Sequence, residues 1–254
     1  MSFFYVWNLN LSKRKPFLIL SAIVVILAFF LWFNRTNLFP IAQENMPAVF
    51  TKGNKDHANI SLTFNISWGD EKIYDILSVL EKEKTVPTFF LRGEWAERHP
   101  EIIEKILEQK HEIGMLGYRY KSYLDQDLQR VRQDLYLAQD AFRKLGLESI
   151  RLLRAPKGHL NEEIIELAKN LGFTVIHWNV NPNDWENPGT EEIIQTVLDD
   201  TKRGDIILLH ASDSAKQTSK ALESILPGLT KKGFNMVTVS ELISQVETDA
   251  KLIH

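Results

Sequence analysis

The chain has 254 residues, of which 44% are hydrophobic, 25% charged and 10% aromatic, and it contains no cysteine. This composition excludes a disordered or collagen-like chain, a disulfide scaffold and a metal site with thiolate ligands. Four of the 30 Lys and Arg residues and none of the 33 Asp and Glu residues lie in the first 35 positions, which leaves 26 basic against 33 acidic residues and a formal charge of −7. We expect no nucleic-acid binding from so acidic a remainder.

An apolar segment near the N-terminus predicts a membrane anchor. Residues 17–33 read FLILSAIVVILAFFLWF, in which Ser21 is the only polar side chain. A helix of this length spans roughly 25 Å, close to the lower limit for a hydrocarbon core of ~30 Å. A cleaved signal peptide is the less favoured alternative, because the apolar run exceeds the usual ~7 to 15 residues. In addition, no A-x-A site follows between positions 34 and 47.

Basic residues orient the predicted anchor. Three lie before it, at positions 13–15, and one lies after it, at position 35. The more basic flank stays in the cytoplasm. The pattern therefore predicts a cytoplasmic tail at residues 1–15, a membrane-spanning helix at residues 16–34 and an extracytoplasmic remainder, in a single-pass protein of a bacterial cell membrane.

The rest of the chain divides into three parts by composition. Residues 35–57 are polar and contain Pro40, Pro47 and Gly53, which is typical of a tether. Residues 58–246 carry regular hydrophobic patterns and predict one folded domain. Residues 247–254 are expected to form a short tail.

Short β-rich runs alternate with longer segments of helical periodicity from position 58 onward. Seven strands are predicted, at 59–64, 86–91, 113–116, 151–153, 173–178, 205–209 and 234–239. Helices are predicted at 70–84, 100–110, 128–145, 161–171, 191–203 and 216–232, the last broken at Pro227. The third helix carries apolar residues at intervals of three or four, which predicts one core-facing stripe. Its members are Leu128, Val131, Leu135, Ala138, Phe142 and Leu145.

This alternation predicts a parallel sheet with crossover helices. The sequence contains neither G-x-G-x-x-G nor G-x-x-x-x-G-K-[ST], which disfavours an open nucleotide-binding sheet. We therefore expect an α/β fold that forms a distorted (β/α) barrel of seven to eight strands. The site of such a barrel lies at the carboxyl ends of its strands.

Five segments at these strand ends resemble the motifs of the polysaccharide deacetylase (NodB-homology) family. They are SLTFNISWGD, HEIGMLGYRY, RAPKG, NPNDW and LLH, which begin at Ser61, His111, Arg154, Asn181 and Leu208. The resemblance covers about residues 60–243. It is closest to the sporulation-type PdaB branch, on the phrases ISWGD, WAERHP and ILLHASDSAKQT, and it implies a distorted β/α barrel that removes acetyl groups from N-acetylated sugars.

The resemblance implies that half of the family's catalytic apparatus is missing. It assigns the position of the base, an Asp in the family, to Asn65, and those of the three metal ligands to Ile66, Leu116 and Tyr120. An amide cannot take a proton from water. Two apolar side chains and a phenol cannot replace the carboxylate and two imidazoles that bind a zinc-like metal. We therefore expect no metal cofactor and a catalytically impaired site.

The other half matches the family better. By resemblance Arg154 corresponds to the arginine that orients the base, and His210 corresponds to the acid. Asp184 and Trp185 complete D-x-x-D-W, and Leu208 corresponds to the acetyl-pocket leucine. Two positions depart from the pattern: Asn181 stands where the first Asp of that motif is expected, and Lys157 stands where a tyrosine is usual.

Three further features are ambiguous. Asp70 follows the first motif and could replace the lost base, but the N-cap of the following helix is the favoured interpretation. Trp68 and Trp185 are either platforms for sugar rings or core residues. The basic residues between the third and fourth strands predict only a solvated surface; they are Lys121, Arg130 and Arg132.

Three functions stay open on this basis. The first is a membrane-anchored pseudoenzyme that binds peptidoglycan or another N-acetylated glycan, and the PdaB-like resemblance implies a role in the spore cortex. The second is an active deacetylase with an atypical, metal-free site that uses His210, Asp184, Arg154 and Asp70. The third is an envelope scaffold that binds no glycan.

Overall fold

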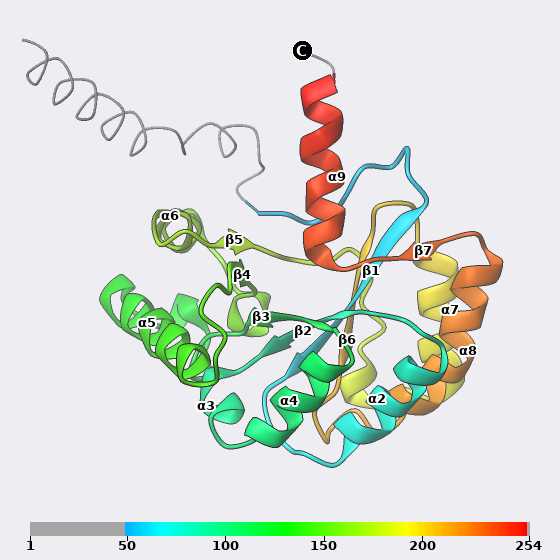
Figure 1. Ribbon diagram of the computed structural model, residues 1–254, viewed down its shortest axis with the longest axis horizontal. Helices are drawn as coiled ribbons and strands as arrows, with labels where there is room; N and C mark the ends of the chain where they lie inside the picture. The colour runs from blue at the N-terminus through cyan, green and yellow to red at the C-terminus, as the bar shows by residue number, and fades with distance from the viewer. Residues whose placement is uncertain (1–48, 253–254) are drawn as a thin grey trace, which may run out of the picture. The chain divides into compact units, whose positions relative to one another are not determined.

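The computed structural model describes residues 49–252, which contain one seven-stranded sheet (Figure 1). The strands are β1 Asn59–Ile66, β2 Thr88–Leu91, β3 Glu112–Met115, β4 Leu152–Leu153, β5 Thr174–Val175, β6 Ile206–His210 and β7 Asn235–Met236. Their order is β5-β4-β3-β2-β1-β6, every pair is parallel, and β7 pairs with the start of β1. All seven predicted strands are therefore confirmed.

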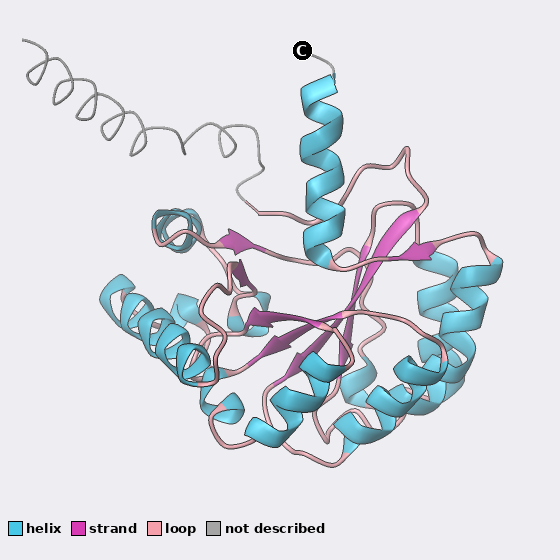
Figure 2. Ribbon diagram, viewed as in Figure 1, coloured by secondary structure: helices cyan, strands magenta, loops and turns pink. Residues whose placement is uncertain are grey.

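Alternation along β1 separates the hydrophobic core from the site. Leu62, Phe64 and Ile66 belong to the apolar cluster that packs against the helices. Thr63 and Asn65 belong to the other set of alternating residues, whose side chains leave the opposite face of the sheet. Figure 2 shows the helices on the outer side of the curved sheet. The inner face is thus the one that supplies site residues.

The sheet curls but does not form the complete barrel predicted from the sequence. Beyond β5 the chain continues to Val180, which makes an isolated parallel bridge to Ile207 of β6. The backbone N–H groups of Asn179 and Val180 also donate to the Ile206 carbonyl, so a short irregular segment and not a full strand links the two sides. Strands β4 and β5 have only two residues each and offer few ladder hydrogen bonds. The result is a curled half-barrel whose strands deliver their carboxyl ends to one mouth.

Eight helices surround the sheet in the described residues. They are α2 Lys72–Lys82, α3 Gly93–Ala96, α4 Pro100–Glu108, α5 Leu128–Lys144, α6 Glu162–Asn170, α7 Thr190–Asp200, α8 Thr218–Lys231 and α9 Val239–Leu252. The stripe of α5 is confirmed in its middle, where Val131, Leu135, Ala138 and Phe142 are buried, whereas Leu128 in the first turn is exposed. The predicted break at Pro227 is wrong: α8 runs through it, held by the buried side chains of Ile225, Leu226 and Leu229.

Both flanks of the predicted domain are better ordered than their polarity suggested. Phe50, in the predicted tether, is buried and bridges Ile176, and Lys52 makes an ion pair of 2.7 Å with Asp205. At the other end α9 continues through the predicted tail to Leu252, and Asp249 accepts a hydrogen bond from Asn54. The fold therefore includes residues on both sides of 58–246.

The predicted localisation in a bacterial cell membrane is contradicted. No helix within residues 49–252 is long and apolar enough to cross a bilayer. The longest of them, α5, has 17 residues and is amphipathic, because its buried stripe alternates with charged residues that face solvent. The predicted anchor at 16–34 and the tail at 1–15 lie outside the described residues.

Candidate functional site

Three strands bring the predicted polar residues together at the mouth of the half-barrel. Asn65 on β1 is the register partner of His210 on β6, so the two lie on adjacent strands at the same level. Arg154 directly follows β4, and its Nη1 donates a hydrogen bond of 3.0 Å to Asn65 Oδ1. The structure therefore brings these three residues together at the carboxyl ends of the strands, where the sequence predicts a site.

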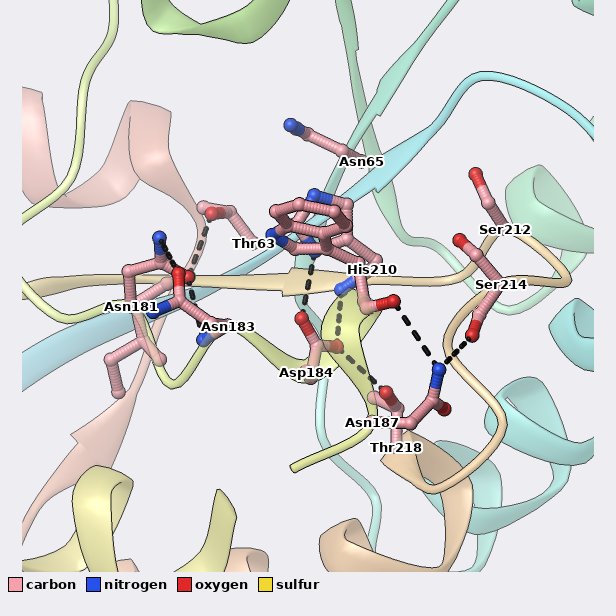
Figure 3. A network of polar contacts seen from close by, with 12 residues as sticks. Thr63, Asn65, Asn181, Asn183, Asp184, Asn187, His210, Ser212, Ser214 and Thr218 are labelled. Carbon is pink, nitrogen blue, oxygen red and sulfur yellow. Dashed lines mark hydrogen bonds and ion pairs between the residues drawn. The ribbon is translucent and has the colours of Figure 1, made fainter. Parts of the chain in front are cut away.

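A buried carboxylate organises the His210 side of the mouth (Figure 3). Asp184 lies in the 3-10 turn Asp184–Glu186 and is fully buried. Its oxygens accept from the backbone N–H of His210 at 2.8 Å and from the hydroxyl of Thr218 at 2.7 Å, and His210 Nδ1 lies 2.7 Å from Oδ1. This contact favours the tautomer with a proton on Nδ1, which leaves Nε2 as the atom that can accept or donate a proton.

The Arg154 side of the mouth lacks a carboxylate. The Arg154 guanidinium is completely buried, 4.0 Å from the ring centroid of Phe90 and 5.4 Å from that of Trp178. Its only hydrogen-bond partner among the described residues is the neutral amide of Asn65, and its Nε and Nη2 atoms have none. Burial lowers the pKa of Arg154 to about 9, which still leaves the group charged at neutral pH.

Asp70 fills neither of its predicted roles. Helix α2 begins at Lys72, and its first N–H groups are capped by Asp213 from the loop after β6, whose carboxylate accepts from Asp70, Glu71 and Lys72 at 2.9–3.3 Å. The side chain of Asp70 is exposed and lies 4.0 Å from His99 Nε2. It makes no polar contact with Asn65, Arg154 or His210 in the described structure.

Asn181 also differs from its expected position in the site. Its side chain accepts from the backbone N–H of Asn183 at 3.0 Å and donates to the Asn183 side chain at 2.9 Å, in a local turn where Asn183 has a φ of 50°. Figure 3 shows this pair directed away from Asp184. Asn181 therefore shapes the loop and does not contact His210.

The remaining predicted ligand-binding residues lie around the mouth. Trp68 and Trp185 are 52% and 47% exposed, so they are surface residues and not core. Lys157 is exposed and adopts a left-handed φ of 61°, a backbone conformation that is strained for residues other than glycine. Leu208 is buried on the inner side of β6, in register with Thr63.

Sequence reasoning missed the side chains that fasten the loops of the mouth. The Thr218 hydroxyl donates a hydrogen bond to Asp184. The side-chain amide of Asn187 donates to the Ser214 carbonyl and accepts from the Lys216 N–H, both at 2.8 Å (Figure 3). The hydroxyl of Ser212 accepts from the Ser67 N–H at 3.0 Å and so joins the ends of β1 and β6. The sequence signal for Ser212 and Thr218 was a run of small polar residues after His210, and Asn187 had none.

The sequence is similar to that of a known protein family over much of its length. A family model described as polysaccharide deacetylase matches residues 52–176. A peptidoglycan-N-acetylglucosamine deacetylase of Bacillus cereus is 33% identical over 187 residues, which cover 72% of this chain and 87% of that protein. The chain belongs to the polysaccharide deacetylase family.

Solved structures of this family share the fold. A peptidoglycan N-acetylglucosamine deacetylase superposes with a TM-score of 0.75 at 26% identity, over 80% of this chain and 96% of the other. A pseudoenzyme of carbohydrate esterase family 4 from Bacillus anthracis superposes equally well, with a TM-score of 0.75 at 25% identity over 80% and 71% of the two chains. The deacetylase fold thus accommodates both active and inactive relatives.

The metal of this family does not fit the residues present here. Ile66 and Leu116, at two of the positions assigned to ligands, are completely buried and carry no donor atom. Burial raises the pKa of the Tyr120 hydroxyl at the third, although the Lys157 N–H and the Arg154 charge oppose the rise. A neutral phenol beside two aliphatic side chains is a poor donor set for Zn²⁺. Within the described residues no three His, Asp or Glu side chains are grouped to hold a metal ion.

Proposed function

We propose that this chain binds peptidoglycan or another N-acetylated glycan at the mouth of the half-barrel without deacetylating it by the metal-dependent mechanism of its family. The contact between Asn65 and Arg154 carries the proposal. The position assigned to the base holds an amide, which only forms hydrogen bonds, and the three positions assigned to metal ligands hold two aliphatic side chains and a phenol. Metal coordination lowers the pKa of water from about 15.7 to about 7–9, so its loss forfeits about 9 kcal/mol of nucleophile activation.

Glycan binding is supported by the exposed surface of the mouth. Trp68 and Trp185 each expose about half of their surface close to the ends of β1 and β6. Indole rings with an accessible face are suited to packing against the apolar face of a sugar. The named relatives act on peptidoglycan, and this supports a glycan of the same class as the ligand.

A second candidate, an active deacetylase of atypical mechanism, is favoured by one observation. The pair of Asp184 and His210 is intact, and it could supply a proton to a leaving group from Nε2. A positioned acid contributes about 10²- to 10⁴-fold to a rate, or roughly 3–5 kcal/mol. This is less than the missing activation of water, so binding without turnover remains the first proposal.

A finer proposal concerns the biological setting. The phrases shared with the sporulation-type branch suggest the spore cortex as the source of the glycan. Comparison of a deletion strain with its parent for cortex structure and spore heat resistance tests this. Normal spores from the deletion strain would remove the sporulation role and leave the binding proposal unaffected.

The binding proposal is tested by titrating the full chain with N-acetylglucosamine oligomers and with soluble peptidoglycan fragments in a calorimeter. We expect saturable binding of at least one of them below millimolar concentration. Absence of heat from all of them, for a chain with a cooperative unfolding transition, would contradict the proposal. Acetate release that is abolished by His210→Ala would instead support the second candidate.

A further inference from the structure

A basic pocket lies beside the mouth. It has a volume of about 460 Å³, which is within the range of small-ligand sites. We name it for the four basic residues that line it: Arg119 and Lys121 after β3, Arg130 on α5, and Lys157 after β4. Lys121 and Arg130 were predicted from the sequence to form only a solvated surface, but the fold places them around one concavity with two further cations.

The charges of the basic pocket are poorly compensated. Its lining also contains two acidic residues, Asp125 and Asp134. The carboxylate of Asp134 is already bonded to the N–H groups of Tyr118 and Arg119, both at 2.9 Å, and to the Tyr123 hydroxyl at 3.0 Å. Four cations against two carboxylates leave a positive excess, although the chain beyond position 35 carries a formal charge of −7.

Three of the four cations make no ion pair in the part of the chain that the structure describes. Only Arg130 has a partner, Asp127 at 3.2 Å. Some basic residues elsewhere on the surface are paired, such as Arg98, Arg143 and Lys144. What distinguishes this pocket is that three cations without an ion pair among the described residues line one concavity, which is the arrangement that attracts an anion.

Tyr120 connects the basic pocket to the mouth. It is one of the residues that line the pocket. Its hydroxyl is close enough to Arg154 for that charge to lower its pKa, and Arg154 in turn donates a hydrogen bond to Asn65. A substituent of a glycan that lies over Asn65 could thus extend past Tyr120 toward Arg119 and Lys121.

We infer that the basic pocket binds a carboxylate carried by the glycan, so that the ligand of this chain is an acidic strand and not a neutral oligomer. This inference rests on the proposed function and narrows its ligand class. In peptidoglycan the carboxylate belongs either to the lactyl group of a sugar that carries no peptide or to an attached peptide. Arg and Lys side chains at the rim of a pocket raise affinity for such a group and make it dependent on salt.

The test compares three ligands on the full chain by calorimetry. They are glycan strands freed of peptide by an amidase, the same strands with their carboxylates converted to amides, and neutral N-acetylglucosamine oligomers. We expect the charged strands to bind about tenfold more tightly than the amidated ones, with the difference reduced at high salt. Strands that retain the peptide identify the source of the carboxylate, because their lactyl carboxyl is tied up in the amide bond to the peptide. Weaker binding than the stripped strands assigns the carboxylate to the lactyl group, and equal or tighter binding assigns it to the peptide.

The double variant Arg119→Gln, Lys121→Gln isolates the contribution of the basic pocket. Both side chains are exposed and make no side-chain hydrogen bond in the described structure, so folding should be unaffected. We expect it to remove most of the preference for charged strands and to leave affinity for neutral oligomers unchanged. The control Lys169→Gln, Lys231→Gln removes two exposed charges from α6 and α8 and should keep the preference.

The outcomes separate this inference from the proposed function. The basic pocket does not bind a carboxylate if charged and amidated strands bind equally, or if the control variant loses the preference for charged strands to the same extent. Glycan binding stands in either case. Binding of none of the ligands overturns both.

Discussion

The two sides of the mouth each contain a fully buried charged side chain, but only one of these side chains has all of its hydrogen-bonding atoms paired among the described residues. On the His210 side, the buried Asp184 carboxylate bonds a backbone N–H, an imidazole and a hydroxyl. On the Arg154 side, a buried guanidinium has one neutral partner, and two of its nitrogen atoms have none in the described structure. The Asp184 contacts reach two other segments, the end of β6 and the start of α8, and fasten them to the turn that carries Asp184. We therefore expect this side to stabilise the fold whether or not any reaction occurs.

Loss of the Asp184 carboxylate gives the largest expected effect. Asp184→Ala leaves three buried donors without an acceptor, and we expect a loss of about 3–5 kcal/mol in the free energy of unfolding, measured by urea denaturation. Thr218→Val removes one of the contacts and should cost about 1 kcal/mol. A loss below 1 kcal/mol for Asp184→Ala would show that the network does not hold the loops.

A carboxylate restored on the other side should be stabilising. Asn65→Asp gives the buried Arg154 a charged partner, and we expect a gain of about 1–3 kcal/mol at pH 7. The guanidinium lowers the pKa of the introduced carboxyl in the folded state. Its contribution is therefore present above the unfolded value of about 4 and is lost as the pH falls below it. Unfolding curves at pH 7 and pH 3 measure this, and an unchanged or lower stability at pH 7 would contradict an unsatisfied Arg154.

An exposed aromatic residue should affect binding without affecting folding. Trp185→Ala is expected to weaken binding of N-acetylated oligomers about tenfold, the equivalent of 1.4 kcal/mol, with little change in the thermal midpoint. Tyr136→Ala on α5 is the matched control, because Tyr136 is 51% exposed and belongs to a different segment. Equal losses for the two variants would remove Trp185 from the binding surface.

A buried histidine outside the mouth, His111, also makes the free energy of unfolding depend on pH, in the parent chain as well as in Asn65→Asp. Burial lowers the pKa of His111 from 6.5 to about 4, so the folded chain keeps this ring neutral. Its contribution to stability is present above about pH 6.5 and is lost as the pH falls toward 4, at no more than about 1.4 kcal/mol per pH unit. His111→Gln should flatten the stability profile in this window. An unchanged slope would mean that other groups cause the acid sensitivity.

The sequence predicted what depends on local pattern. Strands were found because the residues of a parallel sheet form short apolar runs, and α5 was found because its buried residues recur every three or four positions. The mouth followed from the rule that parallel strands present their carboxyl ends together. Asn65, Arg154 and His210 could therefore be placed near one another from the sequence alone.

Contacts between distant segments could not be predicted in this way. The cap of α2 is Asp213 and not the adjacent Asp70, because the loop after β6 reaches the helix terminus. The barrel stays incomplete because β4 and β5 are too short to extend the ladder. The basic pocket is assembled from Lys121 and Lys157, which are far apart in the sequence, so a charge pattern along the chain does not reveal it.

The central claim is that the mouth binds a glycan but lacks the base and the metal needed to deacetylate it. The most direct measurement follows bound ligand and free acetate in the same mixture of full chain and peptidoglycan fragments, with and without added zinc. We predict saturable binding and no acetate above the background set by His210→Ala under either condition. Release of acetate that requires both His210 and added zinc would contradict the claim, because it would mean that a metal site forms around Ile66, Leu116 and Tyr120.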